Sequence, residues 1–181
     1  MNEQTVNIHE ALIDRCRSGD SEAHFKLYKL YAKAMYNVGY RITGSEEDAE
    51  DVLQEAFISA FKSLQSYRGE ASFGSWIKKI VVNKAINHVK KRKWEVMPEG
   101  EMFDMVSDEP EQEYLPELSV EKVKHAIQEL PDGYRSVLSL YLIEGYDHQE
   151  IAEIMKITES TSKSQLNRAK NRLRELLLKK I

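Results

Sequence analysis

The fold is decided by one stretch, DHQEIAEIMKITESTSKSQLNRAKNRLREL, which runs from Asp147 to Leu176. It carries two apolar stripes at helical spacing, separated by only a few residues. The inward positions of the two stripes are Ile151, Ala152, Ile154 and Met155, and then Leu166, Ala169, Leu173 and Leu176. Thr158 is a good N-cap for the second helix. Two short helices joined by so tight a turn indicate a helix-turn-helix.

The outward face of the second helix is polar and basic. Its first turns carry Ser160, Thr161, Lys163, Ser164 and Gln165, with Arg168, Arg172 and Arg174 on the flanks. An α-helix fits the major groove of B-DNA, where side chains near its N-terminus reach base edges and phosphates. The pattern therefore predicts DNA binding. The alternative is an ordinary helical hairpin with a solvated basic face.

Lys156 occupies the turn between these two helices, where the backbone tends to be left-handed and glycine is favoured. A lysine can adopt that conformation at a cost of about 1 kcal/mol. Lys156 therefore weakens the match to a helix-turn-helix without overturning it.

Helical spacing also dominates the rest of the chain, without sustained strand-like alternation flanked by hairpin turns. The sequence thus predicts an all-α fold. Segment 95–118 breaks the pattern because it carries prolines, a glycine and only acidic charges, which is typical of a flexible linker. We expect two small helical domains, residues 9–94 and 119–181, joined by this acidic linker.

Charge and composition limit the class of protein. The net charge of −4 alone argues against a polyanionic partner, but the charge is segregated, because residues 71–94 contain bases and no acid. A single cysteine, Cys16, excludes an intramolecular disulfide and fits a reducing compartment. No apolar run is long enough to span a bilayer, and the N-terminus lacks a signal-peptide profile. We expect a cytoplasmic protein that does not insert into membranes.

The first domain has a basic surface of its own. In residues 66–93, Tyr67, Phe73 and Trp76 are interleaved with Arg68, Lys78, Lys79, Asn83, Lys84 and Asn87. Duplex phosphate needs only cations, whereas aromatic rings beside them suit unstacked bases. The alternative is that the rings are core. Both readings stay open for Trp76, while Tyr67 and Phe73, in or next to a polar loop, are expected to be exposed.

An acidic helix precedes this surface. Ser45 is a good N-cap, and three acids follow it at the positive end of the helix dipole. Apolar residues form one stripe, and the reverse face carries Glu50, Asp51, Gln54, Glu55 and Ile58. Taken alone, such a face is more often solvated than bound.

Nothing in the chain indicates catalysis. There is no phosphate-binding glycine loop, no nucleophile with a base at recognisable spacing, and no histidine spacing typical of a metal site. We expect neither an enzyme nor a protein that holds a metal or a cofactor.

Two long segments together resemble a known family. DAEDVLQEAFISAFKSLQSYRGEASFGSWIKKIVVNKAINHVKKRK (48–93) and LPDGYRSVLSLYLIEGYDHQEIAEIMKITESTSKSQLNRAKNRLREL (130–176) resemble a bacterial RNA polymerase sigma factor of the extracytoplasmic-function (ECF) group. The resemblance extends from about Leu12 to Leu178. It implies a subunit that directs core polymerase to promoters, aids strand opening and performs no covalent chemistry.

The resemblance also implies partners and contact residues. Core polymerase, through the clamp helices of its largest subunit and its flap region, and promoter DNA are the expected partners, with an anti-sigma factor as a further one to test. Polymerase docking maps to Asp48, Glu50, Asp51, Gln54, Glu55 and Ile58. The minus-ten element maps to Tyr67, Arg68, Phe73, Ser75, Trp76, Lys79, Asn83, Lys84, Asn87 and Lys91. The minus-thirty-five element maps to Ser160, Thr161, Ser162, Lys163, Gln165, Arg168 and Arg172.

Three positions depart from the family pattern. Lys156 replaces the usual turn glycine, and Ser162 and Gln165 stand where a valine and an arginine are common. A polar Ser162 gives the second helix less apolar anchoring, and the Gln165 amide favours adenine over guanine. The competing hypothesis is a stand-alone helix-turn-helix regulator that binds duplex DNA as a dimer without polymerase.

Overall fold

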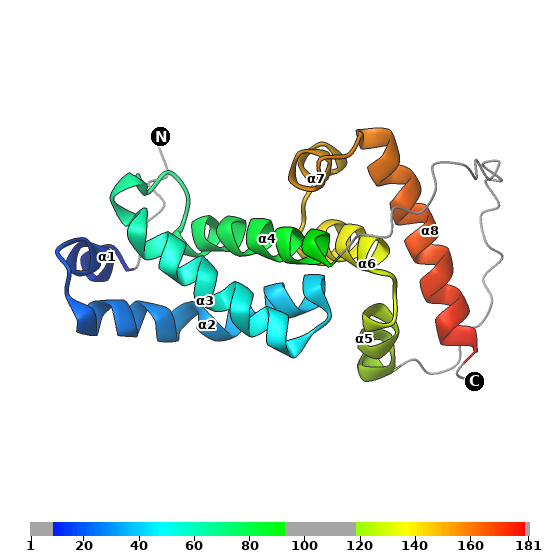
Figure 1. Cartoon of the computed structure of the whole chain (residues 1–181), viewed down its shortest axis with the longest axis horizontal. Helices are drawn as coiled ribbons and strands as arrows, with labels where there is room; N and C mark the ends of the chain where they lie inside the picture. The colour runs from blue at the N-terminus through cyan, green and yellow to red at the C-terminus, as the bar shows by residue number, and fades with distance from the viewer. Residues whose placement is uncertain (1–8, 93–118, 180–181) are drawn as a thin grey trace, which may run out of the picture.

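The computed structural model describes residues 9–92 and 119–179 and consists of helices in two domains (Figure 1). The N-terminal domain comprises α1 (Glu10–Arg17), α2 (Ser21–Thr43), α3 (Glu46–Lys62), the 3-10 turn η1 (Leu64–Ser66) and α4 (Phe73–Lys91). The C-terminal domain comprises α5 (Val120–Gln128), α6 (Asp132–Leu138), the π-helical turn η2 (Ser139–Ile143), α7 (His148–Met155) and α8 (Glu159–Leu178). The predicted all-α class with two domains is confirmed. The predicted acidic linker, 95–118, lies outside the described residues.

Side-chain caps set the helix boundaries where the sequence indicated them. The Ser45 hydroxyl accepts a hydrogen bond from the Asp48 amide at 3.3 Å, and the Thr158 hydroxyl accepts one from the Thr161 amide at 3.0 Å. Each bond satisfies an amide that has no partner within its own helix. The predicted helix starts at α3 and α8 are therefore confirmed.

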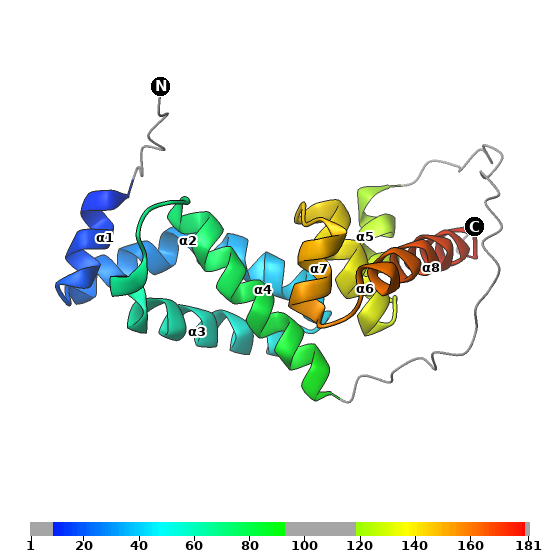
Figure 2. The same ribbon diagram turned by 90° about the horizontal axis from the view of Figure 1, so that it is seen from above.

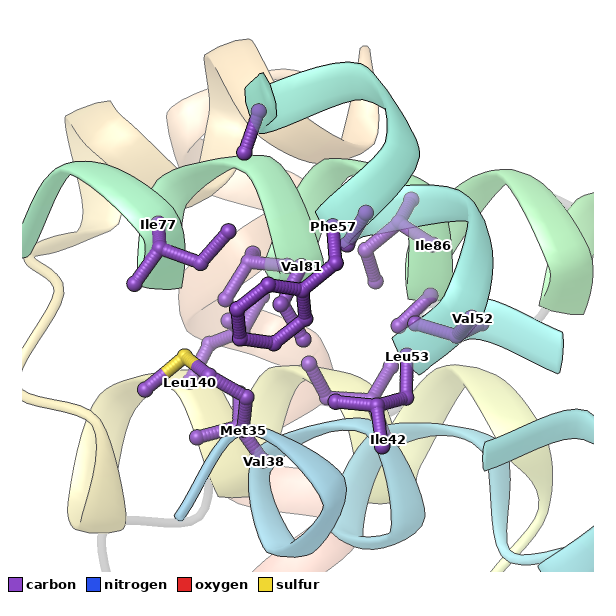
Figure 3. Packing of buried hydrophobic residues seen from close by; sticks show 14 of the residues in the cluster. Met35, Val38, Ile42, Val52, Leu53, Phe57, Ile77, Val81, Ile86 and Leu140 are labelled. Atoms are coloured by element: carbon purple, nitrogen blue, oxygen red, sulfur yellow. The ribbon is translucent and has the colours of Figure 1, made fainter. Parts of the chain in front are cut away.

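The core of the N-terminal domain lies between α2, α3 and α4, which pack against one another. Apolar stripes from the three helices meet there, including Val38 and Ile42, Val52 and Phe57, and Val81 and Ile86 (Figure 3). Leu140 of η2 is fully buried and belongs to the same cluster, so a residue of the C-terminal domain extends this core. The two domains are therefore packed together.

The C-terminal domain is built around α8, which contacts α5, α6 and α7. Between α6 and α7 the chain passes through η2, where the Glu144 amide donates to the Ser139 carbonyl at 3.0 Å. This i to i−5 bond is the wide π-type turn, which is uncommon and often occurs at functional positions. It carries the chain from the buried end of α6 to the surface of the N-terminal domain.

Arg135 joins the two domains through the end of α2. Its side chain is only 5% exposed, and its guanidinium donates to the carbonyls of Ile42 at 3.3 Å and Thr43 at 2.8 Å. It also donates to the Leu130 carbonyl at 2.9 Å and pairs with Asp132 in its own domain. The last carbonyls of a helix lack partners within the helix and carry partial negative charge, so a buried cation is well placed there.

Gly44 leaves room for this contact. It closes α2 in the left-handed region with φ 68°, and a methyl group at its Cα would lie 2.6 Å from Cζ of Arg135. Gly69 also has a positive φ of 73°, yet nothing lies within 4 Å of its corresponding position. The two glycines thus share a backbone requirement and differ only in the Arg135 contact.

We expect Gly44→Ala to lower the free energy of unfolding more than Gly69→Ala does. Both variants place an alanine at positive φ, at a cost of about 1–2 kcal/mol. Gly44→Ala also displaces a buried, hydrogen-bonded guanidinium, which should add at least about 1 kcal/mol. Urea unfolding followed by circular dichroism measures both. Equal losses would show that Arg135 does not depend on the space at Gly44.

Candidate functional site

The helix-turn-helix consists of α7, a tight turn and α8. The Glu150 amide donates to the Asp147 carboxylate at 2.8 Å, and the Glu150 carboxylate accepts from the Asp147 amide at 2.9 Å, so α7 begins with a capping box. Lys156 ends α7 with φ 54° and ψ 47°, and it is the only non-glycine residue with positive φ in the described part of the chain. The turn therefore has the left-handed backbone typical of this motif, with lysine in the place of the usual glycine.

The residues expected from the sequence to contact DNA from α8 differ in their exposure. Ser160, Lys163 and Ser164 are exposed, whereas Thr161, Gln165, Arg168 and Arg172 are half-buried. Nζ of Lys163 lies 2.6 Å from the Glu159 carboxylate, an exposed i to i+4 pair. The second helix therefore presents hydroxyls, an amide and cations along its first three turns.

Ser162 corrects the expected contact list. It is fully buried, and its hydroxyl lies 2.9 Å from Nδ1 of His148 on α7, so it cannot reach DNA from this position. Its spacing to Leu166 and Ala169 places it on the inner stripe of α8, where a hydrogen bond to a neighbouring helix satisfies the hydroxyl. Position 162 is buried because the helical period places it on the inner face of α8, although serine is polar.

Tyr67 and Phe73 were expected to be exposed, and that expectation is wrong. Tyr67 is 4% exposed and Phe73 is fully buried, with their rings 5.8 Å apart in an edge-on arrangement. The Tyr67 hydroxyl donates to the Ala71 carbonyl at 2.6 Å, which folds the loop back over the two rings. Buried aromatic rings with a satisfied hydroxyl stabilise the loop and leave no face free for a base.

Trp76 is the ring that remains partly exposed in this region. It packs on Tyr67 with the ring centroids 5.1 Å apart, and its other surface lines a pocket of about 560 Å³. Arg68, Ser75 and Lys79 line the same pocket from the N-terminal domain. The arrangement leaves one half-buried indole beside polar and cationic side chains.

The polar face of α4 is exposed along its length. Lys79, Asn83, Asn87 and Lys91 recur every four residues, and all four are exposed. Arg68 and Ser75, at the loop and the first turn, are exposed as well, while Lys84 is half-buried. Residues four apart lie on one face of a helix, so this stripe is a continuous basic and amide-bearing surface.

The acidic face of α3 is divided. Glu50, Asp51, Gln54 and Ile58 are exposed, and the Ile58 residue is 54% accessible. Beside them a groove of about 360 Å³ runs between α2 and α3, lined by Tyr28, Ala32, Lys33, Tyr36, Glu50, Leu53 and Gln54. An exposed isoleucine and two tyrosines bordered by acids form a surface suited to a protein partner.

Asp48 and Glu55, two members of the predicted docking set, also contact residues of α4 and the residue after it. Asp48 pairs with Arg92 at the end of α4, and its side chain is 21% exposed. Oε1 of Glu55 lies 3.2 Å from Nε2 of His88, and this hydrogen bond lowers the pKa of the Glu55 carboxyl. Because these contacts join α3 to α4, the two acids support the bundle as well as the surface.

Within residues 9–92 and 119–179, no helix is long and apolar enough to cross a membrane. The same residues contain no group of three or more histidine, cysteine, aspartate or glutamate side chains that could hold a metal ion.

Comparisons with known proteins agree with this arrangement. Residues 27–95 match the family model of sigma-70 region 2, and residues 121–173 match that of sigma-70 region 4. The chain is 30% identical over 176 residues to the ECF RNA polymerase sigma factor SigW of Bacillus subtilis, covering 91% of this chain and 94% of that protein. It is 32% identical over 183 residues to the ECF RNA polymerase sigma-E factor of Haemophilus influenzae, covering 95% and 94%.

A solved structure shows the same fold. The sigma factor RpoE of Bartonella quintana, solved in complex with the anti-sigma factor NepR, matches with a TM-score of 0.55 and 26% identity, covering 84% of this chain and 94% of that one. Both family models, the curated relatives and this structure are those of sigma factors. The chain belongs to the extracytoplasmic-function group of RNA polymerase sigma factors.

Proposed function

We propose that this sigma factor divides its work between two domains. Residues 9–94 dock on core polymerase and recognise the minus-ten element, and residues 119–181 recognise the minus-thirty-five element. The single observation that carries the proposal is the pair of exposed basic helix faces, on α4 and α8, each within a segment that matches a sigma-70 region model. The segment between the domains, 95–118, then serves as an acidic tether.

Docking on polymerase uses the exposed part of the α3 face. Glu50, Asp51, Gln54 and Ile58 offer two charges, an amide and an apolar contact on one surface. The clamp helices of the largest polymerase subunit are the partner that the family resemblance implies. Asp48 and Glu55 act mainly by holding α3 against α4, since His88, Lys84 and Arg92 already contact them.

The minus-ten element is contacted by α4 and the loop before it. Lys79, Lys84 and Lys91 bind phosphate, while Asn83 and Asn87 supply amides for base edges or the sugar-phosphate backbone. Trp76 is the ring that an unstacked base can reach, because it borders the pocket beside Arg68 and Ser75. Tyr67 and Phe73 support the loop beneath it.

The minus-thirty-five element is read by α8 in the major groove. Ser160, Thr161 and Lys163 lie at the N-terminal end that enters the groove, and Arg168 and Arg172 follow toward the backbone. Gln165 is half-buried, and its side-chain oxygen has no hydrogen-bond partner within the described residues. The side-chain oxygen of Gln165 would therefore have to change rotamer before it could bond to a DNA base.

The chain performs no covalent chemistry of its own under this proposal, and it acts in the cytoplasm, where the transcribed DNA lies. A stand-alone regulator is not favoured, because both sigma regions match and the α3 face has no role in such a protein. The test is size-exclusion chromatography with core RNA polymerase. Co-elution with core is expected, whereas a protein that ignores core and shifts duplex DNA as a dimer would refute the proposal.

Charge reversal on α3 should disrupt polymerase binding. We expect Asp51→Lys to weaken the affinity for core polymerase at least about tenfold. The polymerase surface that binds an acidic face would repel the cation of the new lysine. Glu10→Lys on α1 is the matched control, since it makes the same charge change on an exposed residue outside the sigma-70 region 2 match. Fluorescence anisotropy with labelled protein measures both. Equal affinity for the two variants would remove α3 from the docking surface.

Removal of one cation from α8 should change the salt dependence of promoter binding. We expect Lys163→Ala to reduce the slope of log affinity against log salt by about one, because one phosphate contact is lost. The lost pair with Glu159 is exposed and contributes little to stability. Lys179→Ala, at the exposed end of α8, should leave the slope unchanged. The slope is measured by filter binding of holoenzyme, and an unaltered slope for Lys163→Ala would place this lysine away from DNA.

A further inference from the structure

The two helices assigned to promoter recognition lie close together. The C-terminal domain places α7 against α4, and α8 packs on the other side of α7, as Figures 1 and 2 both show. Packed helices have axes about 8–10 Å apart, so α4 and α8 are separated by about 20 Å. This closed arrangement joins two surfaces that must act at different places on DNA.

Promoter geometry requires a much larger separation, given the proposed function on which this inference rests. The minus-ten and minus-thirty-five elements are centred about 25 base pairs apart, which at 3.4 Å per base pair is about 85 Å of B-DNA. Segment 93–118, fully extended, reaches about 90 Å, so the covalent connection allows the domains to separate that far. The closed arrangement is therefore a state of the protein that is not bound to a promoter.

One acidic side chain joins the closed domains across the basic surface. Glu144, directly after η2, has a side chain only 5% exposed. Its Oε1 accepts two hydrogen bonds from the Arg41 guanidinium, at 2.9 Å and 2.6 Å. Nζ of Lys78 lies 3.6 Å from its other carboxylate oxygen and donates to its backbone carbonyl at 3.2 Å. Two cations from α2 and α4 thus converge on one buried carboxylate.

The position of Glu144 also covers the pocket beside Trp76. Glu144, Gly145 and Tyr146 line that pocket opposite Trp76 and Lys79, and the Lys78 ammonium lies 5.6 Å from the centroid of the Tyr146 ring. A carboxylate held by a guanidinium and an ammonium has the charge and donor geometry of a bound phosphate oxygen. The same pair of cations, Arg41 and Lys78, would therefore suit a phosphate oxygen.

We propose that Glu144 acts as an internal substitute for DNA phosphate: it occupies a phosphate-binding pair formed by Arg41 and Lys78 and holds the free sigma factor closed. Arg135, anchored on the end of α2, orients the C-terminal domain so that the turn after η2 delivers Glu144 to this pair. Opening exposes both cations together with the side of the pocket formed by Trp76 and Lys79. Recognition of DNA and release of the closed state are then one competition between carboxylate and phosphate.

Distance measurement in the free protein tests the closed state without polymerase or DNA. Spin labels are attached at Asn83→Cys on α4 and Asn167→Cys on α8, both exposed positions, with Cys16→Ala removing the native thiol. Double electron–electron resonance should give a short distance, about 30 Å or less, for the otherwise native chain. Glu144→Arg should shift the distribution to longer distances, and Glu153→Arg, an exposed acid on α7, should not. A long distance in the native chain, or a short one in Glu144→Arg, overturns the proposal.

A charge swap separates the ion pair from general effects of the substitution. Arg41→Glu alone should also lengthen the distance, whereas the double variant Arg41→Glu with Glu144→Arg should restore a short component, because the pair is reformed with its charges exchanged. Lack of any restoration would assign the opening to misfolding or to Lys78 alone and would refute the pair as the latch. Helix content by circular dichroism accompanies each variant.

DNA binding supplies the functional readout. Glu144→Arg in the absence of polymerase should bind a promoter fragment at least about threefold more tightly than Glu153→Arg, which makes the same change in net charge. Equal affinities would show that closure does not cover a DNA site. Failure of the native protein to bind core polymerase would instead refute the proposed function, and the label distances would still report whether Glu144 holds the domains together.

Discussion

The end of α2 is the constraint on which the arrangement of the whole molecule depends. A helix that stops at Thr43 leaves carbonyl groups with partial negative charge, and Gly44 turns the chain away from them. Arg135 of the other domain donates to the carbonyls of Ile42 and Thr43, and Arg92, directly after α4, donates to the Thr43 carbonyl at 3.1 Å. In the closed state these acceptors stabilise the buried guanidinium of Arg135, so docking at this helix end fixes α6, then η2, and finally the place of Glu144.

The exposed charged surfaces are fixed by helix orientation, because each helix must bury its apolar stripe and so exposes the opposite face. In α3 one stripe is buried in the core, which leaves Glu50, Asp51 and Gln54 exposed on the face that we propose docks on polymerase. The same logic in α4 and α8 produces two basic faces on rigid elements. Packed together, these faces cannot serve two distant DNA elements at once, so the function of a two-domain sigma factor requires the interdomain contacts to be reversible. Two kinds of contact hold the domains together: the buried hydrogen bonds from Arg135 to the end of α2, and an ionic contact at Glu144. The two cations that bind Glu144 also suit phosphate.

Local rules explain why much of this could be predicted from sequence. The caps Ser45 and Thr158, the left-handed Lys156 and the basic face of α8 all depend on neighbours within a few residues, and each agrees with its structure. Polarity and loop position do not predict exposure at two positions. Tyr67 and Ser162 are buried, and each hydroxyl has a hydrogen-bond partner inside the protein. The Arg135 and Glu144 contacts join residues about a hundred positions apart, and no periodicity in one sequence reveals such a pairing.

Promoter selection for core polymerase is the activity on which the roles of all three surfaces depend. It is measured directly by transcription in vitro from fragmented genomic DNA by core polymerase, with and without the protein, followed by sequencing of the RNA 5′ ends. We expect a set of start sites present only with the protein, which share two upstream sequence elements centred about 25 base pairs apart. Start sites that do not change when the protein is added would contradict this expectation.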